Sequence, residues 1–253
     1  MVPPARSVPP RATTAPPRAS AANADTLPAR RTAEPASRST SSRGSPAAAP
    51  ESSTPVSTAP AAGADDFQLA LYYQRAGDFD NALIHYRALL QRNPMNAQAR
   101  NNLGLLYQNK GLLDEAIAEF QRALYVDSRY LRARNNLGVA LLKQGSVDAA
   151  AAEFRSVLAQ EPRNIDALVN LALAEKAAGH PERAKETLLR ALVIDQRSAP
   201  AHYNLGMLFE ATGEPGRAIE HYRAFLEHAG TGYADRAPEV RARLDVLTAR
   251  RTP

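Results

Sequence analysis

The segment AQARNNLGLLYQNKGLLDEAIAEFQRALYVDSRY, residues 97–130, decides how the rest of the sequence is interpreted, because a shift of 34 residues in either direction aligns it with a similar segment. Five frames follow one another without insertion or deletion, at 63–96, 97–130, 131–164, 165–198 and 199–232. Every frame has Leu at position 7, Gly at position 15, Ala at position 20 and Leu at position 28. Residues 63–232 therefore form an array of five internal repeats.

Each repeat is predicted to fold as two amphipathic helices. In the second repeat Leu103 and Tyr107 have helical spacing, and Ala116 and Phe120 belong to a second apolar stripe. Gly111 separates the two stripes, and a glycine there ends the first helix in the left-handed conformation without steric cost. We therefore expect an antiparallel helical hairpin.

The residues after the position-15 glycine favour the start of a new helix. Asp78 and Ser146 are candidate N-caps, and Pro181 and Pro215 suit a first helical turn. A single hairpin cannot bury both of its faces, so neighbouring hairpins must stack. The expected fold is all-α, a right-handed α-solenoid of five hairpins.

The period and the repeated positions resemble the tetratricopeptide repeat, whose pattern has W-x2-L-G-x2-Y in the first helix and A, F, A and P further on. The second repeat matches at Leu103, Gly104, Tyr107, Ala116, Phe120 and Ala123. No repeat has Trp at position 4, and the fourth repeat has Glu175 where an aromatic residue is expected. We expect the Glu175 carboxylate to lean out toward Lys176, Arg183 or solvent.

Residues 235–251 are predicted to form a capping helix after the last repeat. Val240, Leu244 and Leu247 give this helix an apolar stripe, and Pro238 lies in its first turn. A solenoid needs a cap because an open last repeat would expose an apolar face.

Residues 1–62 are predicted to be a disordered tail. They consist mostly of Pro, Ala, Ser, Thr and Arg, and seven Arg against three acidic residues give the tail a charge of +4, out of a net +5 for the 253-residue chain. Such a composition cannot offset an ordering cost of roughly 1–2 kcal/mol per residue. We interpret the tail as a spacer. A nucleic-acid-binding arm is the alternative, but the Arg are sparse and no aromatic residues lie between them.

No run of 18 apolar residues predicts a membrane span, and no apolar segment behind Met1 predicts a secretory signal. We expect a soluble protein, with a cytoplasmic location favoured. An envelope anchor is the alternative if the N-terminus is incomplete.

An enzyme is not expected. The chain has no Cys, no nucleophile-elbow motif and no phosphate-binding loop, and its five His are scattered over different repeat positions. His221 and His228 are seven residues apart on one predicted helix, so they do not form the i, i+4 pair that binds zinc. We therefore expect no metal and no cofactor.

The candidate binding residues form a polar column at position 6 of the repeats, which we call the amide column. Its members are Gln68, Asn102, Asn136, Asn170 and Asn204. Asn is a mediocre helix former, so its recurrence indicates a role other than helix stability. Because the column precedes the Leu at position 7, we expect its side chains to face the concave side and to bind the backbone of an extended peptide. A solvated helix face is the alternative. Selectivity would come from neighbours, chiefly Asn101, Asn135, Arg132 and Lys143.

The amide column is similar to the inner Asn array of the tetratricopeptide superhelix of O-linked N-acetylglucosamine transferases, where Asn side chains hold an extended peptide. The similarity ends with the repeats, so no transferase activity is implied. The family's carboxylate clamp is only partly matched, by Asn102 and Arg132, because Phe67 and Leu71 stand in the first repeat where other clamp residues belong.

These observations favour a non-enzymatic bacterial adaptor that binds an extended protein segment, in the assembly of a secretion, pilus or envelope complex by analogy with the family. The alternative is a structural self-association module.

Overall fold

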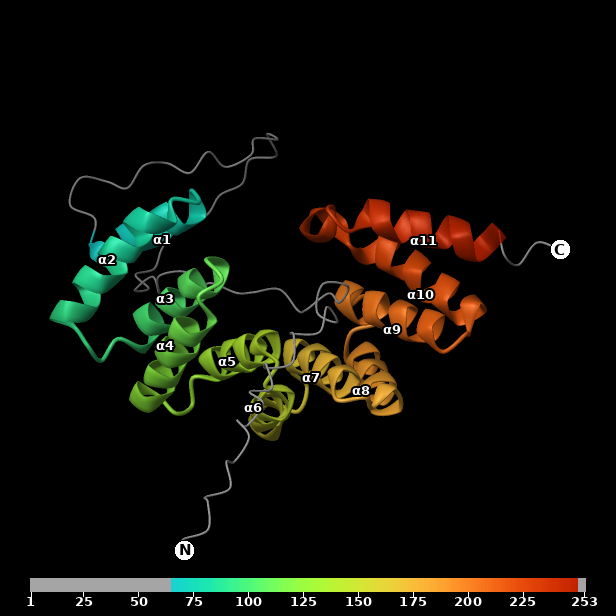
Figure 1. Cartoon of the computed structure of the whole chain (residues 1–253), viewed down its shortest axis with the longest axis horizontal. Coiled ribbons are helices and arrows are strands. Elements are labelled where there is room, and N and C mark those ends of the chain that lie inside the picture. Colours follow the sequence, from blue (N-terminus) through green and yellow to red (C-terminus); the bar gives the residue numbers. More distant parts are fainter. Residues whose placement is uncertain (1–64, 250–253) are drawn as a thin grey trace, which may run out of the picture.

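A computed structural model describes residues 65–249 of the chain as a series of α-helices (Figure 1). Two helices fall in each repeat and one follows the last repeat: α1 (Asp66–Arg75), α2 (Phe79–Arg92), α3 (Ala97–Asn109), α4 (Leu113–Val126), α5 (Leu131–Gln144), α6 (Val147–Gln160), α7 (Ile165–Ala177), α8 (Pro181–Ile194), α9 (Ala199–Ala211), α10 (Pro215–His228) and α11 (Ala237–Ala249). A short 3-10 turn, η2 (Gly230–Tyr233), precedes α11. The expected disordered tail, 1–62, lies outside the described residues.

The predicted helix boundaries are confirmed by the backbone. The five glycines at position 15 all have positive φ, between 76° at Gly213 and 92° at Gly145, so each takes the left-handed conformation. Asp78 caps α2 by accepting a hydrogen bond from the Asn81 amide at 3.2 Å. Ser146 occupies the N-cap position of α6 but makes no such bond.

Within each hairpin, a bulky side chain at position 24 lies against a small residue at position 8. A Cβ atom added to Gly104 would come within 2.6 Å of the Phe120 ring, and one added to Gly138 within 2.5 Å of Phe154. The aromatic rings thus fill the space between the two helices of one hairpin, as well as packing toward the next.

The hairpins stack in chain order along an arc (Figure 1). The second helix of each hairpin packs on the first helix of the next, and the first helices also contact one another, α3 with α5, α5 with α7 and α7 with α9. These first helices therefore form the inner layer, whose surface we call the inner face. The expected right-handed solenoid of five hairpins is confirmed.

The capping helix is confirmed as α11, which packs on α10. Its Val240 and Leu247 are buried in the same apolar cluster as residues of α7 to α10, and Leu244 packs against that cluster. Between residues 65 and 249, no helix is both long and apolar enough to cross a membrane.

Candidate peptide-binding face

The amide column runs along the inner helices, but most of its side chains are not open to solvent. Gln68 on α1 is exposed. The other four are buried, with exposed fractions of 0% for Asn102, 4% for Asn136, 1% for Asn170 and 3% for Asn204. These four Asn are therefore largely covered by neighbouring residues, and from α3 to α9 the contacts between successive first helices contribute to this burial. Peptide binding by the column stays a prediction.

Part of the amide column is used to join adjacent repeats. The Nδ2 atom of Asn136 donates to Oδ1 of Asn101 at 2.8 Å, and Nδ2 of Asn170 donates to Oδ1 of Asn135 at 3.2 Å. Each bond links position 6 of one repeat to position 5 of the preceding repeat. Two residues proposed as selectivity neighbours, Asn101 and Asn135, thus act as acceptors within the solenoid.

The pattern changes where position 5 has no amide. Val169 cannot accept a hydrogen bond, and Asn204 in the next repeat instead donates to the Pro200 carbonyl of its own helix at 2.8 Å. Phe67 occupies position 5 of the first repeat, so Asn102 finds no side-chain acceptor there; its Oδ1 instead accepts from Nδ2 of Asn101 at 3.2 Å. The Asn–Asn doublets at 101–102 and 135–136 were a signal in the sequence that these positions form pairs.

A polar cavity of about 250 Å³ opens between the start of α5 and the loop that joins α6 to α7. It is lined by Leu131, Arg132, Asn135, Glu161, Asn164 and Asp166. The Nη1 atom of Arg132 is buried and has no hydrogen-bond partner among the described residues. Burial raises the pKa of the Asp166 carboxyl. Two sequence-predicted residues, Arg132 and Asn135, meet in this cavity, whereas Lys143 lies exposed at the other end of α5.

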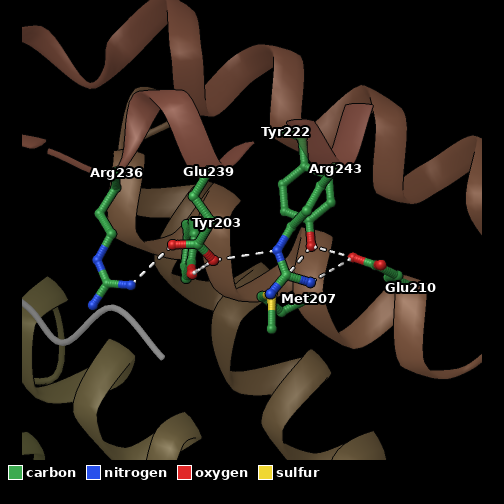
Figure 2. Close-up of polar contacts among 7 residues, drawn as sticks. All are labelled: Tyr203, Met207, Glu210, Tyr222, Arg236, Glu239 and Arg243. Atoms are coloured by element: carbon green, nitrogen blue, oxygen red, sulfur yellow. Dashed lines mark hydrogen bonds and ion pairs between the residues drawn. The ribbon is translucent and has the colours of Figure 1, made fainter. Parts of the chain in front are cut away.

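A polar network that was not predicted from the sequence holds the capping helix on the end of the inner face (Figure 2). Glu239 of α11 accepts hydrogen bonds from the Tyr203 hydroxyl at 3.0 Å, from Arg236 at 3.0 Å and from Arg243 at 3.2 Å. Burial alone would raise the pKa of Glu239, but the bonds from Arg236, Tyr203 and Arg243 lower it.

Arg243 also joins α11 to the last hairpin, because its Nη1 atom lies 3.3 Å from Oε2 of Glu210. The Tyr222 hydroxyl donates to the same oxygen at 2.7 Å. Burial, followed by the neighbouring Glu239, raises the pKa of Tyr203 to about 12. The i, i+4 spacing of Glu239 and Arg243 was visible in the sequence, but the partner Glu210 lies 33 residues away.

Glu175, the charged residue at a core position, stays inside. Only 8% of it is exposed, and it accepts a hydrogen bond from the Thr187 hydroxyl at 2.8 Å. The expectation that this carboxylate leans out is wrong, because Thr187 of the same hairpin satisfies it.

Three of the five His, scattered in the sequence, come together in the last hairpin. The rings of His202 and His221 are 5.2 Å apart and those of His202 and His228 are 6.0 Å apart. No group of three His, Cys, Asp or Glu within residues 65–249 is arranged to hold a metal ion.

Comparisons with known proteins agree with this architecture. Tetratricopeptide repeat family models match residues 67–129, 141–208 and 201–237. A search of curated proteins finds no match. Among solved structures, PilW, described as a widely conserved type IV pilus biogenesis factor, has a TM-score of 0.62 at 22% identity over 74% of this chain and 94% of that chain.

Two further structures are similar. PilF of Pseudomonas aeruginosa has a TM-score of 0.60 at 22% identity over 73% of this chain and 88% of that chain. MamA has a TM-score of 0.56 at 24% identity over 64% of this chain and 94% of that chain. At these identities the structures show a shared fold.

Proposed function

Because the chain belongs to the tetratricopeptide repeat family, we propose that it is a non-enzymatic scaffold that binds an extended segment of a partner protein along its inner face. The family model and the solenoid fold support protein–protein interaction as the general role. The residues of the inner face support an extended peptide as the ligand.

The observation that carries the proposal is the polar cavity around Arg132. A buried guanidinium N–H without an acceptor costs free energy, and a shift of the Arg132 side chain toward a ligand carbonyl in the cavity would recover that cost. Asn135 adds an amide group, and Glu161 and Asp166 add carboxylates that can accept. Asn164 donates to Glu161 at 2.7 Å and caps α7 by accepting from the Ala167 amide, so it holds this lining in place. A cavity that offers donors and acceptors together suits a peptide unit, which has one of each, better than it suits a simple anion.

The remaining candidate residues take different parts in this proposal. Gln68 and Lys143 are exposed, so we propose that they contact the ligand directly. Asn101, Asn102 and Asn136 are buried, and we propose that they set the spacing of the inner helices. Asn170 and Asn204 are buried as well and donate to Asn135 and to the Pro200 carbonyl, so we propose the same spacing role for them. A few net hydrogen bonds of about 0.5–1.5 kcal/mol each make micromolar affinity the expected scale.

We also propose that the partner belongs to a bacterial secretion, pilus or envelope complex. The support for this step is the shared fold with PilF and with PilW, which is a type IV pilus biogenesis factor.

The test is a selection of displayed random peptides on the full chain, followed by fluorescence anisotropy with the selected peptides. Arg132→Gln should weaken binding about tenfold, since it removes a charged hydrogen bond of roughly 1.5 kcal/mol. Arg129→Gln is the matched control, because Arg129 is an exposed arginine outside the cavity. Equal binding by both variants would remove the cavity from the proposal.

Self-association is the second candidate function, and two exposed apolar side chains favour it. Tyr125 on α4 is 88% exposed and Val193 on α8 is 83% exposed. Sedimentation of the full chain distinguishes the two functions. A dimer that is lost in Tyr125→Ser or Val193→Ser, combined with no peptide selection, would replace the scaffold proposal.

A further inference from the structure

The two helices of a hairpin are joined by a side-chain pair at positions 4 and 23, which are 19 residues apart. In the second repeat Arg100 donates to Glu119 at 3.1 Å, and in the third repeat Arg134 donates to Glu153 at 2.9 Å. Each of these arginines also donates to the backbone carbonyl six residues earlier, at 2.9 Å and 3.1 Å respectively. We call this arrangement the hairpin lock.

The fifth repeat builds the same lock from two histidines. His202 and His221 are again 19 residues apart, and their Nδ1 atoms are 2.9 Å from each other. Nε2 of His202 lies 2.9 Å from the carbonyl of Gln196, six residues earlier. His202 therefore makes both contacts that the arginines make, with a side chain that is neutral at pH 7 unless a partner holds its proton.

The proton positions follow from these contacts. Since a carbonyl only accepts, Nε2 of His202 carries the hydrogen that points to Gln196, and Nδ1 of neutral His202 is an acceptor. His221 must then donate through its own Nδ1. One added proton can be accommodated if His221 changes tautomer, but two added protons place an N–H on both sides of the 2.9 Å contact.

The surroundings do not supply an anion that would hold two protons on this pair. On α10, Arg217 and His228 disfavour further positive charge, whereas Glu227 on α10 and Asp195 at the end of α8 favour it through space without a hydrogen bond. Arg236, just before α11, and Glu239 and Arg243 within it are engaged elsewhere, because they bind one another, Tyr203 and Glu210. The Phe209 ring stacks on His221 at 5.4 Å with an interplanar angle of 5°.

We propose that the His202–His221 lock makes the fifth repeat and the capping helix an acid-sensitive end of the solenoid, which opens in mild acid while the second and third repeats stay closed. Those two repeats contain no His and use Arg–Glu locks. In the first repeat Nδ1 of His85 lies 2.8 Å from the carboxylate of Asp66, so that pair contains an anion, which the His202–His221 pair lacks.

The direction of the effect is set by the proton balance. Burial lowers the pKa of His202, and burial together with His202 and Arg217 lowers the pKa of His221 to about 4. The unfolded segment therefore binds more protons than the folded one below the ordinary value of 6.5, and the closed state loses stability as the pH falls from about 6.5 toward about 4. With these values for His221, the opening equilibrium rises about tenfold between about pH 7.5 and about pH 5.5.

The experiment is native-state hydrogen exchange of the full chain at these two pH values, with each rate divided by the intrinsic rate for that pH. We expect α9, α10 and α11 to lose protection about tenfold at the lower pH relative to α3–α6. Equal relative protection at both pH values would overturn the proposal. Because the pKa of Glu239 is lowered, its contribution to stability changes only below its ordinary value of 4.5, which lies outside the range of the experiment.

Two replacement locks taken from the chain itself supply the variants. His202→Arg with His221→Glu copies the third repeat, and His202→Leu with His221→Thr copies Leu168 and Thr187 of the fourth. Whichever variant folds should show the same relative protection at both pH values. His228→Gln should keep the pH effect of the parent, because the His202–His221 contact remains. A pH effect that survives both replacements, or that disappears in His228→Gln, would overturn the assignment to this lock.

Discussion

Asn136 donates its side-chain N–H to Oδ1 of Asn101 at 2.8 Å, so that a buried amide pair ties the inner helices of two adjacent repeats together. The repeated Asn at position 6 indicated a ligand surface, but the structure shows that position 5 of the preceding repeat is its partner here. A residue type that recurs in successive repeats can therefore stabilise the contacts between those repeats.

Asn101→Ala is expected to destabilise the chain by about 1–3 kcal/mol, because it leaves the buried Asn136 amide without its acceptor. Urea denaturation followed by circular dichroism measures the change. Gln121→Ala is the control, since Gln121 is exposed on α4. Identical midpoints for the two variants would show that the amide pair is not a stabilising contact.

Thr187→Val is expected to cost about 1–3 kcal/mol, because the buried Glu175 carboxylate loses its hydrogen-bond donor. The control is Thr212→Val, which removes a hydroxyl that binds Glu214 at an exposed site at 3.1 Å. Thermal unfolding of the two variants provides the comparison. Adding Glu175→Leu to Thr187→Val should recover part of the loss, and a further loss would contradict the account.

Phe120→Tyr is expected to stabilise the second repeat by about 0.5–1.5 kcal/mol. The reason is that the added hydroxyl can bind the side chain of Gln108. That side chain is buried, and neither its oxygen nor its nitrogen is hydrogen-bonded among the described residues. In the first repeat the equivalent Tyr86 hydroxyl donates to Gln74 at 2.7 Å.

The matched control for this prediction is Phe154→Tyr in the third repeat, where the equivalent position 12 is Leu142 and offers no side-chain acceptor. That variant should be less stable than the parent, and the free energy of unfolding in urea measures both changes. A lower stability for Phe120→Tyr than for Phe154→Tyr would refute the role given to Gln108.

Arg243→Met is expected to loosen the capping helix, because Arg243 bridges Glu239 and Glu210 while Met keeps most of the apolar stem (Figure 2). Charged hydrogen bonds at a partly exposed site predict a loss of about 1–2 kcal/mol in the protection of α11 amides. Hydrogen exchange at neutral pH measures it. Arg241→Met, an exposed arginine of the same helix, should leave the protection unchanged.

Much of the fold was predictable because it depends on local features. Gly111 and Gly145 end helices through their own backbone conformations, and Pro181 and Pro215 begin helices through theirs.

The site was less predictable. Asn102 and Lys143 were both predicted from the sequence to contact the peptide, yet one is fully buried and the other exposed. Repeat position gives the direction of a side chain and not the distance to the next helix.

The sequence by itself determined the repeat length, the two helices of each hairpin, the turns between them and the cap, because apolar periodicity and residues with special backbone preferences act over one or two helical turns. Only the tertiary structure decided which polar side chains meet. The pairs Asn136–Asn101, His202–His221 and Arg243–Glu210 are separated by 35, 19 and 33 residues. Their contacts depend on how closely the hairpins approach and how the solenoid twists, and these quantities are set by the packing of many side chains together.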